Sequence, residues 1–453
     1  MRRADPGGPG RPGSPAGQRE DRLRAVRAAP AVRAVRSLLS QPAVPYAGFA
    51  VFAAMVALFA GQGPHRLWGG FAAVAYGCAA LASVSRPARA WHVPVMIALA
   101  GAVLAPLGWL ASAGVAMPEV GVVERSAAMF LRHGSLYQTS GALAAGHQVY
   151  GYDPYLPLMM VFGLPHAIFG GGLATDPRVW DGVAFAILIG LALRVAGGSH
   201  VVRRTALLVA SPLIAFPLTV SGNDLPVVGL MCLGLAYAAS GGRTALPSGA
   251  GGAVRSAGLA VGARPVAAGL ALGAAAALKA TAWPALVIVG VLFAARNGMR
   301  PAGRFALAAG AALAVVTGPV LVTEPAALIQ NTVMFPLGLT KAVSPAASPL
   351  PGHLLAAIGP AGDLAAIALL ITAALALAAA LLLFPPRGLP AAAWFLIAGL
   401  TLMFSLAPAS RWGYFVYPIG IWAWLGLSGR ISPRPRAPAR PAETTRVHAS
   451  ISA

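Results

Sequence analysis

Uncharged apolar blocks as long as a lipid bilayer is thick recur along this sequence, and residues 95–116 and 364–383 are two of them. A helix needs roughly 20 apolar residues to cross the hydrocarbon core of a membrane. Inside that core every backbone amide must find its hydrogen-bond partner within its own element, so these blocks are predicted to be helices. Only 10% of the 453 residues are charged, whereas soluble domains carry about 25%. The chain is therefore predicted to be an all-α polytopic membrane protein.

The formal net charge of +21 is distributed as a topology signal. Nine of the 33 basic residues lie in the first 36 positions, five follow Gly429, and most others fall between apolar blocks. This pattern orients membrane helices and attracts anionic lipid, so it does not indicate nucleic-acid binding. Residues 1–42 and 430–453 are predicted to be disordered basic tails in the cytoplasm, on either side of one transmembrane domain, 43–429. The expected location is the cell membrane.

Placing both tails inside and applying the positive-inside rule predicts about twelve transmembrane helices. They lie near residues 44–62, 67–84, 95–116, 179–197, 205–221, 225–240, 266–278, 282–295, 304–322, 363–384, 390–408 and 412–428. Segments 117–178 and 323–362 are then outer loops. The shorter apolar stretch 155–169 is predicted to be an interfacial helix, because counting it as a span would move Arg203 and Arg204 to the outer side.

Acidic residues were not used to place these spans, and they are unevenly distributed between the two sides. Of the 12 Asp and Glu residues, four lie in the tails, and the other eight all fall on the predicted outer side. They are Glu119, Glu124, Asp153, Asp176, Asp181, Asp224, Glu324 and Asp363. Acidic residues contribute little to orientation, so the bias indicates a functional outer face. The alternative is that acids simply persist where arginines are absent.

The first outer loop contains the residues best suited to chemistry. Glu119 stands where the third span leaves the bilayer, and an amphipathic helix is predicted over 122–131, ended by Gly134. A carboxylate fixed at the membrane surface can act as a general base toward a hydroxyl group. The alternative is a solvated acid that stabilises the helix dipole. Glu124 is the reserve candidate for the base.

This loop resembles the first outer loop of integral-membrane glycosyltransferases of the GT-C type. It is most similar to the actinobacterial polyprenol-phosphate-mannose-dependent mannosyltransferases, glycosyltransferase family 87. The matching positions are Glu119, Val122-Val123, Ala127-Ala128, Gly134, Tyr137 and Tyr152-Asp153-Pro154. The resemblance implies a GT-C-like fold in which Glu119 is the catalytic base. The chain differs from the family in having Glu119 where Asp is usual and Asp153 in place of a proline.

Two cations are candidates for binding a lipid-linked phosphate. Lys279 follows a Gly-rich apolar block, and Arg411 precedes a run of aromatic residues at the outer interface. The alternative for Lys279 is a lysine that only extends its ammonium to the membrane surface. The alternative for Arg411 is an anchor in the belt of aromatic residues at the membrane interface. Seven further polar residues are expected to face a substrate cavity: Tyr137, Tyr152, Asp153, Asn223, Asp224, Lys341 and His353.

The resemblance implies transfer of a hexose, expected to be mannose, from a polyprenyl-phosphate donor to a glycolipid or cell-envelope glycan. No Asp-x-Asp pair and no His cluster with zinc spacing occurs in the sequence, so no metal and no other cofactor is expected. A phosphate-binding Gly-x-x-x-x-Gly-Lys-Ser/Thr motif is also absent, which argues against ATP-driven transport by this chain alone. A transporter or lipid flippase, or a non-catalytic homologue, remains the alternative interpretation.

Overall fold

The computed structural model describes residues 41, 43–85, 90–139, 141–143, 149–239, 262–340, 342 and 344–429. These residues form helices and loops, and no strand occurs among them. The two predicted tails, apart from residue 41, lie outside the described residues. The all-α fold class predicted from the apolar blocks is therefore confirmed for the described part of the chain.

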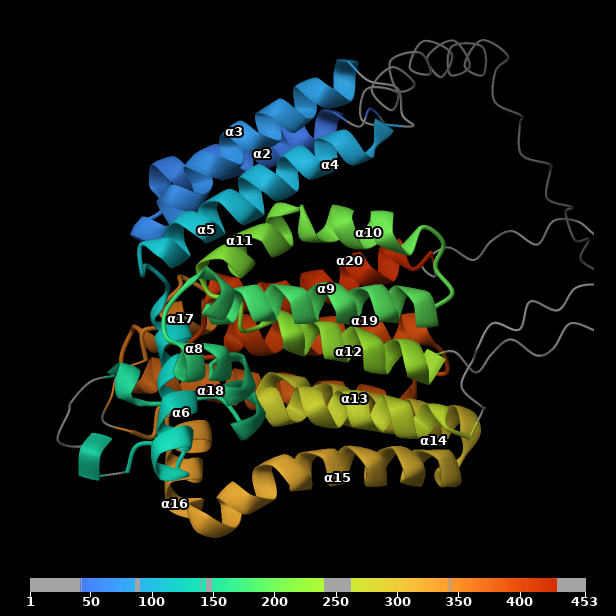
Figure 1. The fold of residues 1–453 in the computed structure, drawn as a ribbon. Helices are drawn as coiled ribbons and strands as arrows, with labels where there is room; N and C mark the ends of the chain where they lie inside the picture. The colour runs from blue at the N-terminus through green and yellow to red at the C-terminus, as the bar shows by residue number, and fades with distance from the viewer. Residues whose placement is uncertain are drawn as a thin grey trace, which may run out of the picture.

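The long helices run back and forth to form one bundle (Figure 1). Their bounds are α2 Ala43–Phe59, α3 Gly63–Ser85, α4 His92–Leu99, α5 Ala105–Ser112, α9 Pro177–Val195, α10 Val201–Val209, α11 Pro212–Val220, α12 Leu225–Ala239, α13 Arg264–Leu278, α14 Trp283–Asn297, α15 Met299–Thr323, α18 Pro360–Leu383, α19 Leu389–Leu406 and α20 Val416–Leu427. A π-helical turn, η2 (Ala100–Leu104), joins α4 to α5.

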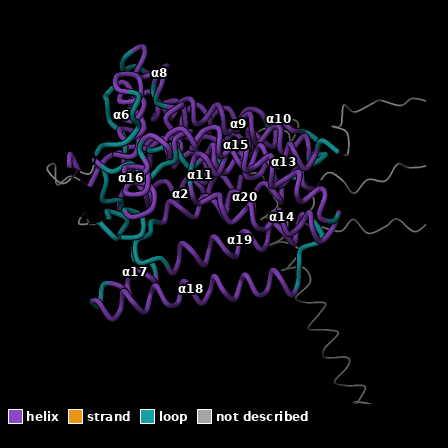
Figure 2. The backbone as a smooth tube through the Cα atoms, turned by 90° about the horizontal axis from the view of Figure 1, so that it is seen from below, coloured by secondary structure: helices purple, strands orange, loops and turns teal. Residues whose placement is uncertain are grey.

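Short helices fill the connections at one end of the bundle. They are the α-helices α6 Pro118–His133, α8 Leu164–Phe169, α16 Pro325–Ile329 and α17 Pro351–Ala356, the 3-10 turns η3 Val149–Gly151, η4 Pro157–Phe162, η5 Leu173–Thr175, η7 Ala280–Ala282 and η9 Trp412–Phe415, and the π-helical turn η8 Gln330–Met334. Figures 1 and 2 place α6, α8, α16 and α17 together at this end.

A helix lies at each of the twelve predicted spans, although the count of twelve membrane crossings stays a prediction. By length and composition, six helical segments of the described chain can cross a membrane, or seven if the bent pair α10 and α11 is one span. That pair is bent by 59° at Pro212, because proline cannot donate the helical hydrogen bond and disfavours helix in the preceding residue. These helices confirm a multi-pass membrane protein.

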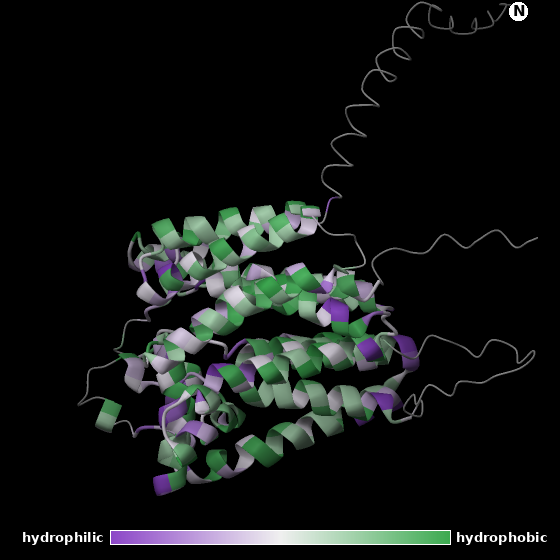
Figure 3. Cartoon of the chain, turned by 45° about the horizontal axis from the view of Figure 1, so that its top comes forward, coloured by the Kyte–Doolittle hydropathy of each residue, from purple (hydrophilic) through white to green (hydrophobic). Residues whose placement is uncertain are grey.

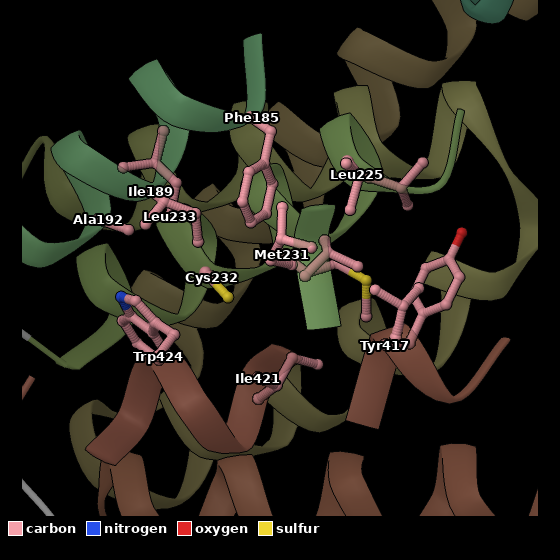
Figure 4. Close-up of a cluster of buried hydrophobic side chains, with 14 of the residues drawn as sticks. Phe185, Ile189, Ala192, Leu225, Met231, Cys232, Leu233, Tyr417, Ile421 and Trp424 are labelled. Atoms are coloured by element: carbon pink, nitrogen blue, oxygen red, sulfur yellow. The ribbon is translucent and has the colours of Figure 1, made fainter. Parts of the chain in front are cut away.

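The core lies where α9, α12 and α20 meet. Phe185 and Ile189 of α9, Met231 and Cys232 of α12, and Trp424 of α20 point toward one another there (Figure 4). Outward-facing side chains on the long helices are apolar as well, and polar positions collect toward the helix ends (Figure 3). This distribution suits a helix bundle that is surrounded by lipid at its middle and by water at its ends.

Glycines bring α13 and α15 into close contact. A Cβ atom placed on Gly269 would lie 2.4 Å from the carbonyl oxygen of Phe305, and one on Gly273 would lie 2.5 Å from that of Ala309. Apolar side chains gain little by leaving lipid for a helix interface, so close backbone packing through small residues is what holds such helices together.

We call the end of the bundle where α9, α12 and α20 begin the acidic end. All eight acidic residues outside the predicted tails lie there, in α6, in the surrounding loops, or within the first two turns of α9 and α18. The sequence-based topology predicted this grouping. Which side of the membrane the acidic end faces stays a prediction.

Helix α6 lies across the acidic end (Figure 1). It begins at Pro118 and ends at Gly134, whose φ of +69° is the left-handed conformation that favours glycine. The predicted helix ended by Gly134 is thus confirmed, with a start four residues earlier than expected. The apolar stretch 155–169 forms the two short helices η4 and α8 instead of one interfacial helix, because Pro157 and Pro165 each start a new helix.

Candidate functional site

An ion pair between Lys279 and Asp224 lies at the acidic end, between α12 and α13. The Tyr417 hydroxyl donates to the same Asp224 Oδ1 at 2.7 Å. The Lys279 ammonium also stands 4.9 Å from the ring centroid of Tyr155 and 5.6 Å from that of Tyr414, within the range of cation–π attraction. Lys279 is only 8% exposed, and this pairing offsets the cost of burying its charge.

The backbone around Lys279 and Asp224 explains how the two meet. Helix α13 ends at Leu278, and Lys279 is in an extended conformation. The Leu278 carbonyl accepts from the Leu156 amide at 3.1 Å, so the loop that contains Leu156 is fixed to this helix end. On the other side, Gly222 has a φ of +79° and turns the chain sharply between α11 and α12, which places Asp224 directly before α12.

A second ion pair joins Glu119 to Arg411. Glu119 lies in the first turn of α6, and Arg411 immediately precedes η9. The Arg411 side chain is 27% exposed and the Glu119 side chain is 19% exposed. Arg411 contacts Glu119 Oε1, while Glu119 Oε2 is buried without a hydrogen-bond partner among the described residues. One oxygen of this carboxylate therefore has its accepting capacity free.

The short segment 411–417 connects the two ion pairs. Arg411 binds Glu119, Tyr414 lies over Lys279, and Tyr417 binds Asp224. Tyr414 and Tyr417 are three residues apart, which places them on the same side of a helical turn. The structure thus brings both predicted phosphate-binding cations, Lys279 and Arg411, to one region of the acidic end together with Glu119.

A third basic residue, Arg178, is a buried structural anchor. Its guanidinium contacts both Asp176 oxygens at 2.9 and 2.7 Å and donates to the carbonyls of Val115 and Thr219 at 3.1 and 2.9 Å. Asp176 also caps α9 by accepting from the Arg178 amide. Arg178 therefore ties the start of α9 to the ends of α5 and α11.

Glu124, the reserve candidate for the base, forms an ion pair with neither Lys279 nor Arg411. Its carboxylate pairs with His166 Nδ1 of α8 at 3.2 Å. Burial raises the pKa of Glu124, and His166 opposes that shift. Because its ion-pair partner His166 belongs to α8, Glu124 attaches α6 and α8 to each other.

Four of the predicted cavity residues are buried in contacts between loops or loop and helix. The Tyr137 hydroxyl donates to the Tyr155 carbonyl at 2.8 Å, and the Asn223 amide group donates to the Tyr155 hydroxyl at 2.7 Å. Tyr152 stacks on Phe335 with ring centroids 4.6 Å apart. The Tyr155 amide donates to Asp153 Oδ1 at 2.9 Å.

Asp153 is 5% exposed, and its environment opposes its charge. Burial raises the pKa of Asp153 to about 6, although the Tyr155 amide and the Arg125 guanidinium favour the carboxylate. The Asp153 amide donates to Asn331 Oδ1 at 2.8 Å, and the Asn331 amide group donates to the Ala327 carbonyl at 2.9 Å. Asp153 thus joins the loop after η3 to the π-helical turn η8.

Of the other predicted cavity residues, Asp224 pairs with Lys279, as described above, and His353 makes a different contact. Lys341 lies outside the described residues. The His353 Nδ1 atom lies 3.0 Å from the Pro408 carbonyl oxygen. Next to it is an apolar groove of about 340 Å³, lined by Pro351, Gly352, Leu354, Leu355, Ile358, Ala366, Leu369 and Leu406. Leu406 precedes Arg411 by five residues, so the groove lies near the Glu119–Arg411 pair along the chain.

Sequence reasoning left Tyr155, Tyr414 and Tyr417 out of the predicted site. Their spacing offered a signal, because aromatic residues recur in both loops that border the predicted phosphate-binding cations. Asp181, which is 1% exposed and has its Oδ1 unpartnered among the described residues, was also left out. Within the described residues, no group of three or more His, Cys, Asp and Glu side chains is arranged to hold a metal ion.

Comparison with known proteins finds only distant similarity. No protein-family model matches the sequence, and no curated protein matches it. The solved structure of ArnT from Cupriavidus metallidurans in the apo state has 21% identity and a TM-score of 0.43, over 70% of this chain and 56% of that chain. ArnT bound to undecaprenyl phosphate has 21% identity and a TM-score of 0.46, over 77% and 62%. The chain thus spans less than two thirds of the length of ArnT, and similarity at this level does not establish a shared fold or activity.

Proposed function

We propose that this protein is an integral-membrane glycosyltransferase. Its donor is a polyprenyl-phosphate-linked hexose, expected to be mannose, and its acceptor is a glycolipid or cell-envelope glycan at the outer face. The observation that carries this proposal is the grouping of Glu119, Arg411 and Lys279 at the acidic end. A carboxylate with one free oxygen can act as a general base, and two cations can stabilise a departing phosphate.

The cations suit the leaving group. Transfer frees a phosphate monoester, which carries about −1.5 to −2 charges at pH 7. Arg411 offers a planar guanidinium that can bind two phosphate oxygens, and Lys279 offers a point charge. Stabilising charge that develops on the departing phosphate lowers the barrier to transfer. The groove lined by residues of α17, α18 and α19 is apolar, as an isoprenoid chain requires.

Glu119 suits the acceptor. In the proposed reaction, Glu119 Oε2 takes the proton of the acceptor hydroxyl as that oxygen forms a bond to the anomeric carbon. The bond between the anomeric carbon and the phosphate oxygen breaks, and its electron pair leaves on the phosphate. Glu119 Oε2 accepts no hydrogen bond from the described part of the protein. No such bond therefore has to break before this oxygen takes the proton.

The alternative of coupled transport has less support. Transporters place ionisable residues near the middle of the membrane, often on interrupted helices. In the described part of this chain, charged residues lie in loops, in α6, or within two turns of the end of a long helix. That arrangement favours chemistry at one membrane surface.

The test is transfer of radiolabelled mannose from polyprenyl-phosphate-mannose to endogenous lipids and glycans in membranes. Membranes with wild-type protein are compared with those containing Glu119→Gln, Glu324→Gln or no protein. We expect label to be transferred by the wild type, reduced at least about 100-fold in Glu119→Gln, and retained in Glu324→Gln. Glu324 lies at the same end but accepts from Ser135 at 2.8 Å and contacts neither cation. Full transfer by folded Glu119→Gln would refute the assigned base, and no transfer by the wild type would refute the mannose donor.

A further inference from the structure

Three cations at the acidic end, Arg178, Lys279 and Arg411, differ in how many partners they have. Arg178 makes four contacts that involve both oxygens of Asp176 and two backbone carbonyls. Lys279 is held by Asp224 and two aromatic rings, and Asp224 is held in turn by Tyr417. Neither cation can change partner without breaking a buried network.

Arg411 is held far less tightly. Among the described residues, its guanidinium has Glu119 as its single hydrogen-bonding or ionic partner. Both side chains are partly exposed, at 27% and 19%, so solvent screens their attraction more than it screens the more buried Arg178–Asp176 and Lys279–Asp224 pairs. Of these three cations, Arg411 can therefore exchange its partner at the lowest cost.

The same contact works against both residues in the proposed reaction, although it leaves Glu119 Oε2 without a partner among the described residues. While Glu119 is paired with Arg411, the positive charge stabilises its carboxylate and weakens it as a proton acceptor. The pairing also occupies the guanidinium that a phosphate needs. An enzyme with this arrangement has its base and its phosphate-binding group neutralise each other until a ligand arrives.

We propose that the Glu119–Arg411 pair is a latch that the donor phosphate opens: the phosphate takes Arg411 from Glu119 and so releases the base only when the donor is bound. This inference rests on the proposed function and adds to it an order of events. Its physical basis is competition between two anions for one guanidinium. Phosphate can bind through two oxygens, whereas the carboxylate of Glu119 contacts Arg411 through one.

The latch also explains when the lipid phosphate product is held and when it is released. After transfer, Glu119 carries the proton from the acceptor hydroxyl and is neutral, so it does not compete for Arg411. The lipid phosphate has meanwhile lost its sugar and gained negative charge, so Arg411 holds it. Loss of the proton from Glu119 to solvent restores the carboxylate, which then competes with the lipid phosphate and favours its departure.

If Glu119 and the phosphate compete for Arg411, replacing Glu119 should change the affinity for lipid phosphate in the direction opposite to that expected for a residue that binds the phosphate. Removing the charge of Glu119 should strengthen binding of a lipid phosphate, because the apparent dissociation constant falls when the fraction of free Arg411 rises. We expect Glu119→Gln to bind undecaprenyl phosphate about three- to tenfold more tightly than the wild type, while transfer is lost. A residue that only positions substrate would lose affinity when altered.

The experiment measures equilibrium binding of radiolabelled undecaprenyl phosphate to full-length protein in nanodiscs of neutral phospholipid. The variants are Glu119→Gln, Arg411→Gln, the double variant, and Glu324→Gln as the matched control. The latch requires tighter binding in Glu119→Gln, weaker binding in Arg411→Gln, and no effect of Glu119→Gln once Arg411 is replaced. Glu324→Gln should bind as the wild type does. Glu119→Met is measured in parallel, so that misfolding of one variant does not decide the result.

Three results would overturn the latch. Unchanged or weaker binding in folded Glu119→Gln and Glu119→Met, with transfer lost, would leave Glu119 as the base but remove its hold on Arg411. Tighter binding that persists in the double variant would show that the effect does not pass through Arg411. Failure of the lipid phosphate to bind any folded protein, wild type included, would refute the donor class and the latch together.

Discussion

The backbone amide of Leu156 donates a hydrogen bond to the carbonyl of Leu278 at 3.1 Å, and this contact fixes the segment 149–156 to the last residue of α13. Lys279 follows Leu278 directly, so its position depends on a loop that is more than a hundred residues away in the chain. The loop brings the ring of Tyr155 to Lys279. The site at the acidic end is therefore built by contacts between loops and helix ends, and its stability can be tested one contact at a time.

Replacing Asp224 by Asn should destabilise the protein by on the order of 3 kcal/mol, because the buried Lys279 ammonium would lose its carboxylate partner. The measurement is reversible unfolding in detergent micelles containing SDS. The double variant Asp224→Asn, Lys279→Met should recover part of the loss, since it leaves no unpaired charge. Additive losses in the double variant would show that the two residues do not interact.

Asp153 should make stability depend on pH. Its folded-state pKa of about 6 lies above the ordinary value of 3.8, so between these values the folded protein binds more protons than the unfolded chain. Stability should then be greatest below about pH 4 and should fall by on the order of 3 kcal/mol as the pH rises through 6. In Asp153→Asn this fall should disappear, because an amide stays neutral while its oxygen still accepts from Tyr155.

Unfolding of wild type and Asp153→Asn at a series of pH values between 4 and 8 tests this expectation. Asp363→Asn is the matched control, since it neutralises an exposed carboxylate in the first turn of α18 at the same end. A profile for Asp153→Asn that runs parallel to the wild-type profile would contradict the assignment.

Asn331→Ala should loosen the contact between the two outer loops. Asn331 is fully buried and accepts from the Asp153 amide, so its loss leaves a buried backbone donor unpaired, at a cost of about 1–3 kcal/mol. Hydrogen–deuterium exchange of residues 150–156 should become faster in this variant. Asn297→Ala, at an exposed position at the end of α14, should leave exchange in this segment unchanged. Equal exchange in both variants would show that the Asn331–Asp153 hydrogen bond does not hold this segment.

Gly352→Ala should separate α17 from α19. A Cβ atom at Gly352 would lie 2.1 Å from the carbonyl oxygen of Leu406, and backbone cannot move aside as a flexible side chain can. We expect a loss of about 1–3 kcal/mol in unfolding experiments. Gly303 in α15 has no atom within 4 Å of such a Cβ, so Gly303→Ala should be neutral or stabilising by up to about 1 kcal/mol. A neutral result for Gly352→Ala would mean that α17 packs elsewhere.

Local sequence was sufficient to predict the helices and the end of the bundle at which the acidic residues lie. A run of apolar residues without charge has few alternatives to a helix in lipid, and Gly134 ends α6 because its left-handed backbone conformation favours glycine. The grouping of the eight acidic residues at one end follows from the same reasoning, since each helix reverses the direction of the chain. These features depend on a residue and its near neighbours along the chain.

Only the tertiary structure determined which partners meet. Glu119 and Arg411 were each singled out from the sequence, yet their mutual pairing, and that of Lys279 with Asp224, depends on which helix ends lie next to one another. The physical reason is that Ala-, Gly- and Leu-rich helices are apolar on every side, so their sequences do not specify a unique neighbour. Close contacts such as those of Gly269 and Gly273 with α15 select the packing, and the packing sets the ion pairs at the acidic end.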